Sequence, residues 1–181
     1  PFILLFYRAL RNAKWTAHRK TEAQHSELKR KFSDCVRNSD VRTFFQPIFG
    51  ERGGERFILG YEALSRGPEG KRIEKPEVLF AIAKELSQTA ALDFICFQSA
   101  VRAAALMPAG LLLFVNVEPL SILTPEFKFF LLSQEKPFPA DRLVFEITER
   151  DIIDNYQEFN RNLNFFRRLG IRIAIDDAGS G

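Results

Sequence analysis

Apolar positions alternate between strand-like runs and helix-like stripes from residue 41 onward. Five runs have strand character: residues 41–49, 57–64, 111–115, 143–147 and 171–175. Between them, apolar residues recur at helical spacing over four segments: from Pro76, from about residue 90, over 125–132 and over 156–169. Strands that alternate with helices are typical of an α/β fold whose strands are mainly parallel.

The first two strands are an exception to parallel pairing. Only Gly50–Arg56 separates them, with Gly53 and Gly54 at the centre. Parallel neighbours need a crossover of a dozen or more residues, whereas a short glycine-centred connection makes a hairpin. The sequence therefore predicts an antiparallel first strand.

Three successive strands end with oxygen-bearing side chains. Asn116, Glu146 and Asp176 follow one another at intervals of 30 residues, about one strand and one helix each. Because the carboxyl ends of parallel strands lie at one edge of a sheet, these side chains should converge there. Glu62, near the end of the second strand, joins them if the sheet curls.

Such a cluster contains neither His nor Cys. Its carboxylates repel one another unless a hard dication binds between them, which favours Mg²⁺ or Mn²⁺ over zinc. Asp177 is placed to hold a second ion, and two ions about 3.5–4 Å apart suit attack of water on a phosphodiester. Each residue also has an ordinary alternative: Glu62 in a solvated strand, Asp177 as a helix cap and Asn116 in a turn. Their joint, even spacing favours the metal site.

Composition and charge fit a globular domain with a basic leader. The 181 residues are 46% hydrophobic and 27% charged, which excludes long disorder and collagen-like repeats. The net charge is +3, but residues 1–40 hold nine basic and four acidic residues. Cys35 and Cys96 lie too far apart in sequence for metal or redox spacing, which predicts no disulfide and a reducing compartment.

The leader, residues 1–27, has three interpretations. A basic helical linker from an upstream domain is favoured, because the six apolar residues at 2–7 cannot span a bilayer. The alternatives are the basic flank of a truncated membrane helix and a nucleic-acid-binding arm. No nucleic-acid partner is expected for the chain as a whole.

Five motifs along the chain resemble the EAL domain family, the bacterial phosphodiesterases of cyclic di-GMP. They occur in the family's order over about residues 28–181: FQPI at 45–48, YEALSR at 61–66, VNVEP at 115–119, FEITE at 145–149 and IDDAGSG at 175–181. The resemblance implies a triosephosphate-isomerase-like (β/α) barrel with an antiparallel first strand. It also implies Mg²⁺- or Mn²⁺-dependent opening of cyclic di-GMP to linear pGpG.

The resemblance also implies roles for individual residues. The implied metal ligands are Glu62, Asn116, Glu146, Asp176 and, for the second ion, Asp177, of which Glu62, Asp176 and Asp177 are the catalytic set. The implied substrate contacts are Gln46, Leu64 and Arg66, with Arg66 pairing with a phosphate. Glu149 resembles the residue that braces the loop after the fifth strand. Two positions depart from the usual pattern: Ala178 stands for Phe, and Glu118 stands for Ser.

Such a barrel takes about 250 residues, and this chain does not begin with Met and stops after the fifth strand. We therefore expect residues 28–181 to be the N-terminal part of an EAL domain in a longer protein, with little hydrolysis by the 181-residue chain alone. The alternative function is a catalytically silent cyclic di-GMP receptor. A homodimer and an upstream sensory or diguanylate-cyclase-like domain are the protein partners that fit. The expected location is cytoplasmic, with attachment to a membrane left open.

Overall fold

The structure, a computed structural model, describes residues 22–133, 138–148 and 163–176. The described part begins with helical residues 22–38, and residues 163–168 are helical before the last strand. The other elements, in chain order, are β1 (Arg42–Arg52), β2 (Glu55–Arg66), η1 (Arg72–Glu74), α2 (Pro76–Glu85), α3 (Thr89–Ala103), η2 (Ala104–Leu106), β3 (Leu112–Asn116), η3 (Ser121–Leu123), α4 (Pro125–Leu132), η4 (Ala140–Arg142), β4 (Leu143–Thr148) and β5 (Arg172–Asp176).

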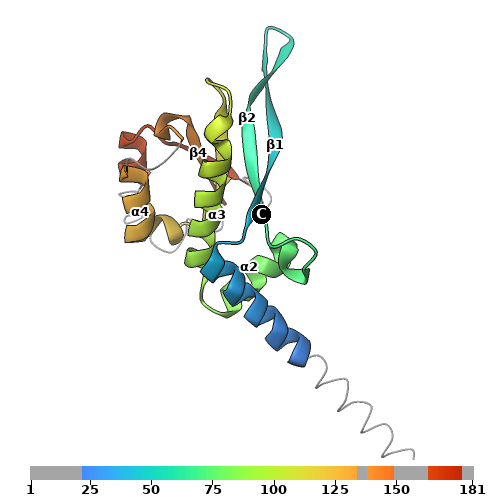
Figure 1. The fold of residues 1–181 in the computed structure, drawn as a ribbon. Helices are drawn as coiled ribbons and strands as arrows, with labels where there is room; N and C mark the ends of the chain where they lie inside the picture. Colours follow the sequence, from blue (N-terminus) through green and yellow to red (C-terminus); the bar gives the residue numbers. More distant parts are fainter. Residues whose placement is uncertain (1–21, 134–137, 149–162, 177–181) are drawn as a thin grey trace, which may run out of the picture.

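One five-stranded sheet runs through these elements in the order β1-β2-β3-β4-β5. β1 pairs with β2 in antiparallel fashion, and each later pair is parallel. The α/β prediction and its antiparallel first strand are therefore confirmed. Figure 1 shows the β1–β2 hairpin extending well beyond the rest of the sheet, since β2 pairs with β3 only from Gly60 onward.

The hairpin is longer than the sequence pattern predicted. Its strands meet at Gly53 and Gly54, whose φ angles of 62° and 83° are the positive values that a tight two-residue hairpin turn requires. Most of the added residues at the tip are charged, with Arg52 opposite Glu55 and Glu51 opposite Arg56 across the strands. Opposite charges on facing strands stabilise pairing without any apolar signal in the sequence.

The larger hydrophobic core joins residues of the sheet to residues of α3 and α4, and it contains six buried phenylalanines. Phe97 of α3 stacks on Phe127 of α4, with ring centroids 4.5 Å apart. Phe145 of β4 meets both rings edge-on, at 5.7 and 5.8 Å. One aromatic cluster thus joins α3, α4 and β4, three elements that are distant in sequence.

A second core joins the helix over 22–38 to η1, α2 and the first half of α3. Phe32 and Leu79 are fully buried in it. Cys35 and Cys96 are buried there as free thiols. Among the described residues, only Thr89–Leu106 is long and apolar enough, by length and composition, to cross a membrane. Residues of this stretch are buried in both cores, so its apolar composition is that of a helix packed inside the fold.

Candidate functional site

The strand register places Glu62, Asn116 and Glu146 on one face of the sheet. Asn116 and Glu146 are direct partners in the β3–β4 pair. Glu62 is the partner of Phe114, two residues before Asn116, and therefore shares its face. On β5, Asp176 takes the register position opposite Thr148, two residues after Glu146. This face is the one opposite to the buried phenylalanine core, since the alternate residues Val115 and Phe145 belong to that core.

Two of the expected ligands are in direct contact. The side-chain amide Nδ2 of Asn116 donates a hydrogen bond to Oε1 of Glu62 at 2.9 Å. With the amide so oriented, Oδ1 of Asn116 and Oε2 of Glu62 are the atoms that can bind a cation. Residues 54 positions apart in sequence therefore meet near the carboxyl ends of β2 and β3.

Glu146 is held level with this pair by the backbone. Its carbonyl oxygen accepts a hydrogen bond from the N–H of Val117 at 3.0 Å, directly after Asn116. Within the parts of the chain that the structure describes, no three His, Cys, Asp or Glu side chains form a cluster able to hold a metal. The oxygen donors that it does bring together fit Mg²⁺ or Mn²⁺, because both ions prefer carboxylate and amide oxygen. Asp177 and Glu149 lie outside the described residues.

The expected substrate contacts lie along the hairpin. Gln46 is exposed on β1 and is the register partner of Glu62. Leu64 and Arg66 are half-buried near the end of β2, on the same strand as Glu62. Arg66 donates a hydrogen bond from Nη1 to the Ser65 carbonyl at 2.9 Å. A ligand lying against the Glu62 carboxylate would therefore find an amide, an apolar side chain and a guanidinium on the same two strands.

Sequence reasoning missed a buried carboxyl beneath the site. Asp93 of α3 is only 3% exposed, and its Oδ2 accepts a hydrogen bond from the N–H of Glu118 at 3.1 Å. Burial raises the pKa of Asp93 from 3.8 to about 7, and the negative charge of Glu118 adds to the rise. Glu118 comes two residues after Asn116, so Asp93 fixes the loop that leaves the candidate metal site. An acidic residue inside the apolar stretch 92–96 was the available signal.

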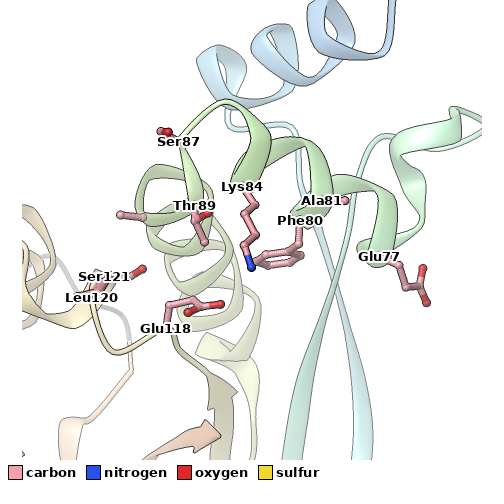
Figure 2. A pocket seen from close by; sticks show the side chains of 10 residues that line it. Glu77, Phe80, Ala81, Lys84, Ser87, Thr89, Glu118, Leu120 and Ser121 are labelled. Atoms are coloured by element: carbon pink, nitrogen blue, oxygen red, sulfur yellow. The ribbon is translucent and has the colours of Figure 1, made fainter. Parts of the chain in front are cut away.

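A pocket of about 640 Å³ lies next to this loop. Figure 2 shows Phe80 and Lys84 of α2 near it, with Glu118 on the loop after β3. Ser121 also lines the pocket, and a hydrogen bond from its side chain to Asp93 partly opposes the rise in the pKa of that carboxyl. Neither Glu62 nor Asn116 is among the lining residues, so the pocket is distinct from the candidate metal site.

Comparison with known proteins decides the family. The family model described as "EAL domain" matches residues 27–181. The chain belongs to the EAL domain family. The EAL signature is therefore Glu62-Ala63-Leu64, and its first residue is the carboxylate that meets Asn116.

Curated relatives and solved structures agree with the assignment. "Probable cyclic di-GMP phosphodiesterase PdeI" of Escherichia coli is 32% identical over 76% of this chain, which spans 18% of that protein. "Cyclic di-GMP phosphodiesterase PdeA" of Borreliella burgdorferi is 27% identical over 62% of the chain, which spans 17% of it. The chain thus spans about a fifth of the length of these relatives.

Among solved structures, the FimX EAL domain of Xanthomonas citri in complex with c-diGMP matches 90% of this chain and 65% of its own length. Its TM-score is 0.76 at 17% identity, which supports the fold alone. Klebsiella pneumoniae BlrP1, in a manganese and cyclic di-GMP complex, matches with TM-score 0.66 and 26% identity over 78% of this chain and 36% of that one. The five-stranded sheet of this EAL domain is therefore part of a TIM-like barrel, as the sequence predicted.

Proposed function

We propose that this chain carries the metal-binding and substrate-positioning side of a cyclic di-GMP phosphodiesterase that yields linear pGpG. The observation that carries the proposal is the hydrogen bond between Asn116 and Glu62, which brings two oxygen ligands together at the carboxyl ends of adjacent strands. The relatives named as cyclic di-GMP phosphodiesterases supply the substrate class.

Each expected residue has a distinct task in this proposal. Glu62, Asn116 and Glu146 hold a divalent cation, together with Asp176, and Asp177 holds a second one. Such cations supply Lewis-acid activation of water and neutralise charge at the phosphodiester. The manganese and calcium complexes of BlrP1 support the choice of a divalent ion, and Mg²⁺ or Mn²⁺ suits the oxygen donors.

The substrate side of the proposal rests on the hairpin. Arg66 pairs with a phosphate oxygen, because its planar guanidinium matches the geometry of that anion. The Gln46 amide, opposite Glu62, offers both a donor and an acceptor, and Leu64 gives an apolar contact between them. These residues orient the dinucleotide so that one phosphodiester lies over the Glu62–Asn116 pair. Glu149 is proposed to brace the loop after the fifth strand.

A second candidate is the silent receptor, which binds cyclic di-GMP without hydrolysing it. The FimX EAL domain in complex with c-diGMP has the same fold and spans nine-tenths of this chain. Glu62 and Asn116 favour the enzyme over the receptor, since a receptor has no need to pair two metal ligands. Binding and turnover therefore have to be measured in the same samples.

Calorimetric titration of the 181-residue chain with cyclic di-GMP, with and without Mn²⁺, tests the proposal, followed by chromatography for pGpG. We expect Mn²⁺-dependent binding and an affinity for Mn²⁺ at least about tenfold lower in Glu62→Gln, because the substitution removes an anionic ligand. Glu55→Gln, at the exposed start of the same strand, is the matched control. Equal Mn²⁺ affinity in wild type and Glu62→Gln contradicts the proposal. Slow pGpG release that depends on Glu62 favours the enzyme, and binding without release favours the receptor.

A further inference from the structure

Two arginines face each other where the hairpin joins the rest of the fold. Arg42 begins β1, Arg66 ends β2, and the two residues are register partners in the antiparallel pair. Like charges on directly opposed residues destabilise a strand pair unless counter-charges offset them. The loop between β2 and α2 supplies two carboxylates close by, those of Glu69 and Glu74.

Arg42 engages both carboxylates. Its Nη2 lies 2.6 Å from Oε1 of Glu74, and its Nη1 lies 3.1 Å from Oε2 of Glu69. Its Nε donates a longer hydrogen bond, 3.4 Å, to the carbonyl of Gly67. All three guanidinium nitrogens therefore contact the same loop, a geometry that a lysine ammonium cannot reproduce.

Glu74 is fixed on its other side by the loop backbone. The Gly70 N–H donates to its Oε2 at 2.9 Å, and the Gly67 N–H donates to its backbone carbonyl at 3.1 Å. The Gly70 hydrogen bond and the contact with Arg42 lower the pKa of Glu74, and the positive charge of Arg66 adds a smaller contribution. Glu74 is thus a stable anion that both arginines attract.

Arg66 has a different set of contacts. Among the described residues, its guanidinium donates a hydrogen bond only to the carbonyl of the adjacent Ser65 and forms no ion pair. The carboxylate that would neutralise it is already bound to Arg42. The guanidinium of Arg42 is fully engaged by the loop, whereas the guanidinium of Arg66 still has N–H groups that can donate to a bound anion.

We propose that Arg42 is a positioning residue that holds Glu74 and Glu69 so that Arg66 remains available to a phosphodiester anion. This inference rests on the proposed function, which gives Arg66 its phosphate. Removal of Arg42 releases Glu74, and Arg66 then pairs with that carboxylate instead of the ligand. Glu74→Gln in the same chain removes the competing charge and restores Arg66 to the ligand.

The test combines binding with a direct signal from Arg66. Cyclic di-GMP affinity is measured with Mn²⁺ for wild type, Arg42→Gln, Arg42→Lys, Arg42→Gln with Glu74→Gln, and the surface control Arg37→Gln. The Nε–Hε NMR signal of Arg66, assigned by its loss in Arg66→Lys, is recorded for each without ligand. We expect about tenfold weaker binding in Arg42→Gln, a smaller loss in Arg42→Lys, unchanged Mn²⁺ affinity and recovery in the double variant. The Arg66 signal should shift in Arg42→Gln and return in the double variant.

An Arg66 signal that does not move in Arg42→Gln overturns the inference, whatever the binding result. Weak binding that the second substitution does not restore also overturns it, because Arg42 then acts on the ligand or on loop stability directly. If wild type binds no cyclic di-GMP, the proposed function fails, while the Arg66 signal still decides the role of Arg42. Should Arg42→Gln fail to fold, Arg42→Lys with and without Glu74→Gln provides the same comparison.

Discussion

Asp93 gives the structure a pH-dependent stability that one substitution removes. Its carboxyl is buried against the loop after β3, and burial raises its pKa to about 7 from 3.8. The folded chain therefore keeps this proton up to about pH 7, whereas the unfolded chain releases it near pH 4. Protonation of Asp93 stabilises the fold at low pH, and that stabilisation is lost as the pH rises toward 7.

The size of the effect follows from the two pKa values. Each unit of difference corresponds to about 1.4 kcal/mol between the protonation states. Between pH 5 and pH 8, the contribution of Asp93 to the free energy of unfolding should fall by roughly 2–3 kcal/mol. Asn is the suitable replacement, because it is neutral at every pH and its amide oxygen can still accept the hydrogen bond from the Glu118 N–H.

Urea denaturation from pH 5 to pH 8 measures this effect in wild type and Asp93→Asn. From pH 5 to pH 8, the unfolding free energy of wild type should fall by roughly 2–3 kcal/mol relative to that of Asp93→Asn. Asp141→Asn, at an exposed position, is the control and should run parallel to wild type. If wild type and Asp93→Asn differ in unfolding free energy by the same amount at every pH, burial does not raise the pKa of Asp93.

Two further substitutions test the packing that positions the site. A Cβ at Gly60 would lie 2.2 Å from the Leu112 carbonyl oxygen, so Gly60→Ala should destabilise the chain by about 3 kcal/mol in urea denaturation. Stability of Gly60→Ala equal to that of wild type would contradict the close approach of β2 and β3. Phe97→Ala removes the ring stacked on Phe127 and should cost about 3–5 kcal/mol by the same measurement. A loss below about 1 kcal/mol would show that the aromatic cluster does not hold the sheet to its helices.

The local elements could be predicted from sequence because their signals are local. The helix Pro125–Leu132 occurs at the predicted bounds, since Pro125 suits the first helical turn. The register pairing of Asn116 with Glu146 could be anticipated because their even spacing places them at the ends of neighbouring parallel strands, whereas the contact of Glu62 with Asn116 was expected only if the sheet curled. Both predictions depend on the spacing of residues along the chain, which can be read directly from the sequence.

Other features depend on tertiary contacts that no periodicity reveals. The ion pair of Arg42 with Glu74 joins residues 32 positions apart through an irregular loop, so charge counting along the chain could not pair them. The charged tip of the hairpin lacks the apolar alternation that marks a strand, and its extension follows from cross-strand pairing of Arg52 and Glu55. Asp93 lies in an apolar stretch of the sequence, and only the packing around it decides its pKa.

The location of a bound Mn²⁺ tests the central claim most directly. Crystals of the chain grown with Mn²⁺ and cyclic di-GMP, with data collected at the manganese absorption edge, would locate the ion by anomalous scattering. The account predicts a peak within coordination distance of the Glu62 carboxylate and the Asn116 amide oxygen, lost in Glu62→Gln. A manganese peak elsewhere, such as at Glu69 and Glu74, with none beside Glu62, would contradict it.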